Sequence, residues 1–145
     1  KRIYLENSFD FVLETVGVFS NFKLIQMAAE SIIKRLQQVL DNVTSNQDLI
    51  YKLEDTMENS YAIKLENEDY TIGKILEINF YDKNFKETRE LDYVSMLKKH
   101  PHDNFSIIKL AFKTTITKDD IISLLENNIE IAILNVNQIR ENFKQ

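Results

Sequence analysis

The sequence predicts an α+β fold in which a few strands alternate with helices. Short stretches alternate apolar and polar residues, as half-buried strands do. Two long stretches repeat apolar residues every three or four positions, as one face of a helix does. Only two glycines and one proline occur among the 145 residues, so tight turns are few. A chain of this length suits one ordinary domain or two small units that share a core.

The first expected elements are a strand and a long helix. Phe9, Phe11 and Leu13 occupy alternate positions, and Gly17 then offers a turn. From about residue 22 the spacing changes to that of a helix, with Asn21 as the expected N-cap. The residues of its apolar face are Ile25, Ala28, Ala29, Ile32, Leu36, Val39, Leu40 and Val43.

A polar run over residues 44–48 and a short apolar patch over 49–53 predict a linker or a frayed helical extension. We treat residues 44–59 as a boundary between a first unit, residues 1–43, and a second unit, residues 60–145. The first unit is too small to bury its own apolar surface, so it needs the second unit or upstream sequence. Because the chain starts Lys1-Arg2-Ile3 without an initiator Met, we expect it to belong to a longer protein.

The second unit is expected to begin with a strand in which Tyr61, Ile63 and Leu65 alternate with more polar neighbours. A helix follows, capped by Asp69 or Thr71. Its first turn contains Gly73, which costs about 1 kcal/mol relative to Ala and implies a close-packing partner.

Two more strands are predicted over residues 91–97 and 105–113, joined by a turn that contains His100 and Pro101. Thr117 and Asp120 then form an expected capping box. A wide apolar face follows, consistent with a long helix that packs on the sheet and on another helix. That face consists of Ile121, Ile122, Leu125, Ile129, Ala132, Ile133, Val136, Ile139 and Phe143.

Three stretches resemble the alpha-like subunits of DNA-directed RNA polymerases. Residues 68–76, Glu-Asp-Tyr-Thr-Ile-Gly-Lys-Ile-Leu, are similar to the smaller subunit's acidic-Asp-His-Thr-Leu-Gly-Asn-Leu-Leu motif, with Tyr70 and Lys74 as departures. Tyr93-Val94 followed by His100-Pro101 resembles that subunit's strand and turn. Residues 9–17, Phe-Asp-Phe-Val-Leu-Glu-Thr-Val-Gly, look like the end of the larger subunit. The fused order is similar to that in large cytoplasmic DNA viruses.

This resemblance implies an intramolecular pseudo-dimer with the order β-α, linker, β-α-β-β-α and two long packed helices. It implies a non-catalytic assembly platform, with magnesium held by the largest polymerase subunit and no cofactor here. The expected partners are the two largest polymerase subunits and small polymerase subunits, in host cytoplasm and virion if viral, or in the nucleus if cellular. The expected dimerisation residues are Ile25, Ile32, Leu36, Val39, Ile122, Leu125, Ile129, Ile133 and Val136. The expected subunit contacts are Thr71, Ile72, Gly73, Lys74, His100 and Pro101.

Other functional classes find little support in the composition. A net charge of −5 argues against direct nucleic-acid binding, and the apolar runs are far too short for a membrane span. The chain has no cysteine and only two histidines, His100 and His102, for which a turn is favoured over a metal site. Glu66, Glu68 and Asp69 are read as helix-capping residues rather than catalytic or cation-binding carboxylates. A stand-alone α+β binding or dimerisation module is the alternative function.

Overall fold

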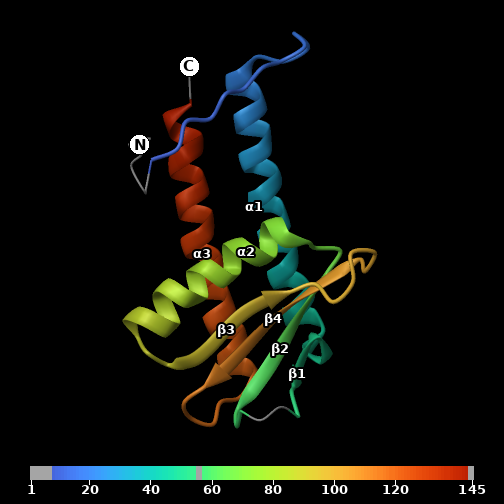
Figure 1. Ribbon diagram of the computed structural model, residues 1–145, viewed down its shortest axis with the longest axis vertical. Coiled ribbons are helices and arrows are strands. Elements are labelled where there is room, and N and C mark those ends of the chain that lie inside the picture. Colours follow the sequence, from blue (N-terminus) through green and yellow to red (C-terminus); the bar gives the residue numbers. More distant parts are fainter. Residues whose placement is uncertain (1–7, 55–56, 144–145) are drawn as a thin grey trace, which may run out of the picture.

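The computed structural model describes residues 8–54 and 57–143 and contains a four-stranded antiparallel sheet with three α-helices (Figure 1). The predicted α+β class is therefore confirmed. The elements in chain order are α1 (Asn21–Ser45), the 3₁₀ turn η1 (Gln47–Leu49), β1 (Ile50–Lys52), β2 (Ser60–Glu66), α2 (Tyr70–Phe80), the π-helical η2 (Tyr81–Glu87), β3 (Leu91–Leu97), β4 (Phe105–Phe112) and α3 (Lys118–Asn142).

The strands lie in the order β1-β2-β4-β3, and every neighbouring pair is antiparallel. Ile63 lies opposite Ile108, and Val94 lies opposite Leu110. Because successive side chains point to opposite faces, these residues share one face of the sheet. That face carries the core, and the three helices cover it.

The core is one cluster of buried apolar side chains drawn from every α-helix and every strand. Its members from α1 pack together with those of the sheet and of α3, so the first helix and the second unit share a core, one of the two alternatives that the sequence leaves open. The fully buried large side chains in the cluster include Leu36, Ile50, Ile63, Leu65, Ile72, Leu76, Phe80, Leu91, Ile108, Leu110, Ile121 and Leu125.

Helices α1 and α3 pack side by side and antiparallel (Figure 1). The start of α1 meets the end of α3, where the rings of Phe22 and Phe143 have centroids 6.2 Å apart. At the opposite ends of the helices, Lys118 Nζ donates a hydrogen bond to the carbonyl oxygen of Gln47 at 2.8 Å. The prediction of two long packed helices is thereby confirmed.

The predicted strand over residues 9–14 is wrong, because the structure has an extended segment there with no strand pairing. Phe9, Phe11 and Val12 are 76%, 92% and 88% exposed. The alternating pattern suits a strand, but a strand also needs a neighbour to accept its main-chain hydrogen bonds. The sheet of the described residues lies at the other end of the molecule (Figure 1).

Two smaller expectations also need correction. The N-cap of α1 is Ser20 rather than Asn21, since the Ser20 hydroxyl accepts a hydrogen bond from Lys23 N–H at 3.2 Å. The stretch expected as a linker contains η1 and β1, and it places Leu49 and Ile50 in the core. A strand of three residues is too short for its alternation to stand out in the sequence.

The remaining elements follow the predictions closely. Strands β2, β3 and β4 occupy the predicted stretches, and β4 ends one residue earlier than expected. Asp69 caps α2, and Thr117 and Asp120 form the capping box of α3. The residues that follow α2 form η2.

Candidate functional site

The α1–α3 pair brings the predicted dimerisation residues together. Leu36, Val39, Leu125 and Ile129 are buried in the shared core. Ile32, Ile122 and Ile133 are half-buried and pack against that core, whereas Ile25 and Val136 are half-buried outside it. Most of the predicted dimerisation residues therefore lie on the faces of α1 and α3 that pack against the core.

The far end of the pair, beyond the sheet, is only partly covered. Gln26 Nε2 donates to the carbonyl oxygen of Phe143 at 3.3 Å and ties the two helices together there. Phe22 and Met27 on α1 are each 40% exposed, and Ile139 on α3 is 53% exposed. This end presents apolar side chains to solvent although the helices contact each other.

The segment before α1 adds more exposed apolar surface at the same end of the molecule (Figure 1). Val16 is 98% exposed and Val18 is 75% exposed. The side-chain Nδ2 of Asn21 donates a hydrogen bond to the carbonyl oxygen of Leu13 at 2.8 Å. This contact holds the segment close to the start of α1. Exposed apolar side chains that gather at one end of a molecule mark interaction sites more often than singly scattered ones do. We call residues 8–19 together with the exposed side chains of Phe22, Met27 and Ile139 the apolar end.

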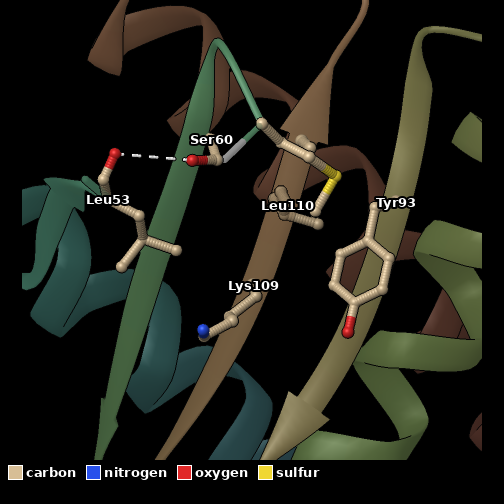
Figure 2. A pocket seen from close by; sticks show the side chains of 7 residues that line it. Leu53, Ser60, Tyr93, Lys109 and Leu110 are labelled. Carbon is tan, nitrogen blue, oxygen red and sulfur yellow. Dashed lines mark hydrogen bonds between the residues drawn. The ribbon is translucent and has the colours of Figure 1, made fainter. Parts of the chain in front are cut away.

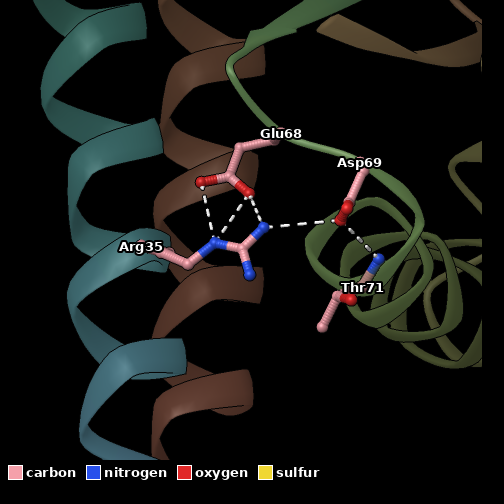
Figure 3. A network of polar contacts seen from close by, with 4 residues as sticks. All are labelled: Arg35, Glu68, Asp69 and Thr71. Atoms are coloured by element: carbon pink, nitrogen blue, oxygen red, sulfur yellow. Dashed lines mark hydrogen bonds and ion pairs between the residues drawn. The ribbon is translucent and has the colours of Figure 1, made fainter. Parts of the chain in front are cut away.

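An ion pair joins α1 to the start of α2 (Figure 3). Arg35 Nε lies 3.0 Å from Glu68 Oε2, and Arg35 Nη2 lies 2.5 Å from the same oxygen. Glu68 is 6% exposed, so its charge is compensated mainly by this guanidinium. Sequence reasoning missed the pair, because its partners are 33 residues apart and belong to different expected units.

Asp69 performs the predicted capping role. Its carboxylate accepts a hydrogen bond from Thr71 N–H at 3.2 Å and lies 3.4 Å from Arg35 Nη2 (Figure 3). The hydrogen bond from Thr71 N–H is the main reason that the pKa of Asp69 lies below its ordinary value, and the positive charge of Arg35 lowers this pKa further. Desolvation of the carboxylate acts in the opposite direction and raises the pKa. The network therefore fixes the start of α2 relative to α1.

The expected subunit contacts on α2 divide into inner and outer residues. Ile72 is fully buried and Gly73 is buried, so both belong to the core rather than to an accessible contact surface. Thr71 and Lys74 are exposed, and Lys74 forms an ion pair with Glu77 on the same helix. Of the four predicted α2 contacts, only the outer two are available to a partner.

Gly73 has the close-packing partner that its place in a helix implies. A Cβ atom at this position would lie 2.7 Å from Cγ and 2.8 Å from Cε of Met96 on β3. Such distances are shorter than van der Waals contact, so a larger residue would require the Met96 side chain to move or α2 to shift away from the sheet. The glycine lets α2 approach the strand.

His100 and Pro101 lie in an exposed turn between β3 and β4, as predicted. His100 N–H donates to Asp103 Oδ2 at 3.1 Å, and Asp103 N–H donates to the carbonyl oxygen of His100 at 3.0 Å. Nearby, Asn67 N–H donates to the carbonyl oxygen of Asn104 at 2.7 Å. The turn is thus tied to the loop before α2, and the structure brings these predicted contacts to one end of the sheet.

The other candidate features of the described residues are clusters of metal ligands and cavities. The described residues contain no group of three or more His, Cys, Asp or Glu side chains arranged to hold a metal ion. On the uncovered face of the sheet, Leu53, Ser60, Tyr93 and Lys109 line a cavity of about 120 Å³ (Figure 2). That volume is below the roughly 300 Å³ at which small-molecule sites begin. The Ser60 hydroxyl points at the carbonyl oxygen of Leu53, 3.5 Å away.

A wider cavity of about 350 Å³ lies between η2 and α3. Asn128 Nδ2 donates to Asn84 Oδ1 at 2.8 Å, and Asn84 Nδ2 donates to Glu90 Oε2 at 2.8 Å. Both asparagines are buried, and their contacts tie η2 to α3. The contacts among Asn84, Glu90 and Asn128 fit a structural role, whereas Asn128 Oδ1 is buried with no hydrogen-bond partner among the described residues.

Comparison with known proteins adds no assignment. No family model matches the chain, and a search of curated proteins finds no match. In the part of the chain that the structure describes, no helix combines the length and apolar character needed to cross a membrane.

Proposed function

We propose that this chain is a non-catalytic assembly subunit of a multisubunit DNA-directed RNA polymerase, in which two alpha-like units pair within one polypeptide. The observation that carries the proposal is the antiparallel packing of α1 against α3. These helices occupy the places that the resemblance gives to the final helices of the larger and smaller alpha-like subunits. Their packing supports an intramolecular pseudo-dimer.

The apolar end supports a role in assembly rather than an isolated existence. Phe11 and Val16 are more than nine-tenths exposed, and the helix ends beside them keep further apolar side chains in water. Covering such surface gains about 25 cal/mol for each Å² removed from water. A stand-alone α+β module, the alternative function, would be expected to lack this surface.

The outer surface at the start of α2 supports docking of a large subunit. Thr71 and Lys74 are exposed, and the Arg35–Glu68 pair and the Asp69 cap hold that helix start in place. A rigid, pre-formed contact surface binds with less loss of conformational entropy than a flexible one. The two largest polymerase subunits are the proposed partners, and the small polymerase subunits would join the same assembly.

Matched variants in the full-length protein test this proposal. Thr71→Arg places a bulky charged side chain in the proposed contact surface, where it should obstruct docking. Thr115→Arg makes the same change in the exposed loop at the opposite end of β2 and β4. We expect Thr71→Arg to reduce co-purification of the largest polymerase subunits at least fivefold and Thr115→Arg to leave it unchanged. Equal recovery of those subunits with both variants would rule out the proposed α2 contact.

A further inference from the structure

The side chain of Asn128 on α3 is buried with half of its amide unpaired. Asn84 Nδ2 donates to Glu90, which leaves Asn84 Oδ1 to face Asn128. Asn128 Nδ2 donates to that oxygen at 2.8 Å and to the carbonyl oxygen of Leu124 at 2.7 Å, so the orientation of its amide is fixed. Asn128 is 0% exposed, and its Oδ1 has no hydrogen-bond partner among the described residues. Because an unpaired buried acceptor is costly, this position calls for a donor from outside the described chain.

Asn128 lies in the wall of the cavity of about 350 Å³ between η2 and α3. This volume exceeds the roughly 300 Å³ at which small-molecule sites begin. Leu124 and Ile131 also line the cavity and offer contact to an alkyl chain. Oδ1 lies beneath the wall, so the Asn128 side chain must turn for a ligand to reach it.

The opposite wall of the cavity belongs to η2, which is a π-helix of seven residues. π-helices are rare and occur frequently at functional sites. Asn84 lies in the middle of η2 and is 3% exposed. The unusual helix therefore points to the same cavity as the Asn128 oxygen does.

The charges around the cavity favour a cation. Glu90 and Glu130 line it, and neither carboxylate forms an ion pair with a described residue. Glu90 Oε2 accepts a hydrogen bond from the neutral amide of Asn84. Lys83 lines the cavity as well, but Glu87, 3.0 Å away, balances its charge. Two carboxylates at the cavity are therefore left without a cation from the described chain.

We propose that this cavity binds a small aliphatic polyamine. Its ammonium groups donate to Glu90, Glu130 and Asn128 Oδ1, and its alkyl chain lies against the apolar wall. A single metal ion fits less well, because it would leave most of the volume unfilled and would gain nothing from Leu124 and Ile131. This inference goes beyond the proposed function, since ligand binding beside η2 does not depend on polymerase assembly.

Titration of the full chain with spermidine, followed by NMR, tests the site. We expect the side-chain amide signals of Asn84 and Asn128 to shift together and to saturate. Nuclear Overhauser effects should join spermidine methylene protons to the methyl protons of Leu124 and Ile131. Neutral butanediol and magnesium chloride should leave the two amides unchanged. No saturable shift at these amides, or the same shift with magnesium chloride or butanediol, would overturn the proposal.

A pair of charge-matched variants separates the site from general attraction between an acidic protein and a cation. Glu130→Gln removes a carboxylate of the cavity, and Glu30→Gln removes the same charge from an exposed position on α1. We expect Glu130→Gln to weaken spermidine binding about fivefold, the upper range for a solvent-exposed ion pair. Glu30→Gln should leave the affinity unchanged. Equal affinities of the two variants would overturn the proposal.

Discussion

At the scale of single residues, Gly73 shows how packing overrides helix propensity. Gly73→Ala should raise helix propensity by about 1 kcal/mol, but the new Cβ would lie 2.7 Å from Met96 Cγ. Overpacking of this kind costs about 1 to 3 kcal/mol. We expect a net loss of unfolding free energy in urea titrations. The loss should shrink when Met96→Ala is present, and a gain in stability with Gly73→Ala alone would contradict this explanation.

The Arg35–Glu68 pair gives a second prediction at this scale. Arg35→Met should lower the free energy of unfolding by about 2 kcal/mol, because it leaves the buried carboxylate of Glu68 without its cation. This loss of unfolding free energy should be smaller than the loss on breaking a fully buried ion pair, because the Arg35 side chain is 32% exposed to solvent. The double variant Arg35→Met/Glu68→Met should recover most of it. A double variant as unstable as the single one would argue against charge burial as the cause.

Asp69 predicts a pH dependence. Its folded-state pKa is lowered, so its contribution is present above the ordinary value of about 4 and is lost as the pH falls through the folded-state value. Asp69→Asn keeps a good N-cap but removes the charge. The difference in unfolding free energy between the two proteins should therefore be constant from pH 7 to pH 5 and should fall below pH 4. A difference that persists unchanged in strong acid would show that Asp69 does not titrate in this way.

At the scale of elements, the sequence predicts those whose signal is local. Strand β2, the capping box of α3 and the Asp69 cap depend on residues close in the chain, and the structure has them where predicted. Strand β1 escapes prediction because three residues carry too little pattern, and residues 9–14 are wrongly predicted as a strand because the pattern says nothing about a neighbour. Pairing is a long-range property.

In the candidate site too, features with a local sequence signal are predicted, and features that depend on distant contacts are not. The apolar spacing predicts the α1 and α3 faces that meet the core. The apolar spacing does not distinguish core residues from exposed contact residues at the start of α2, where Ile72 is fully buried and Thr71 is exposed. The Arg35–Glu68 pair and the π-helical η2 depend on contacts between distant segments, which no local pattern encodes.

Helix α1 should behave as part of the core rather than as a separate unit. Leu36→Ala removes a fully buried side chain and should cost about 2 to 5 kcal/mol. Ile25→Ala, on the same helix but outside the core cluster, should cost about 1 kcal/mol. Hydrogen exchange should show that Leu36→Ala also weakens amide protection in β2 and β4. Unchanged protection in the sheet would mean that α1 folds independently of it.

At the scale of the whole molecule, the two ends differ in character. One end is a sheet and three helices around a continuous core, and the other is an antiparallel helix pair with the exposed apolar end. The first provides stability, and the second provides exposed apolar surface that a partner can bind. This division is what the proposed assembly role requires, because the platform must fold before the large subunits dock.

Purification of the tagged full-length protein from its native cells, followed by mass spectrometry, tests the proposed assembly role most directly. We predict that the two largest RNA polymerase subunits co-purify with it in amounts close to one copy per copy of this chain. Recovery of the protein without either large subunit, under salt conditions that keep polymerase complexes intact, would contradict that role.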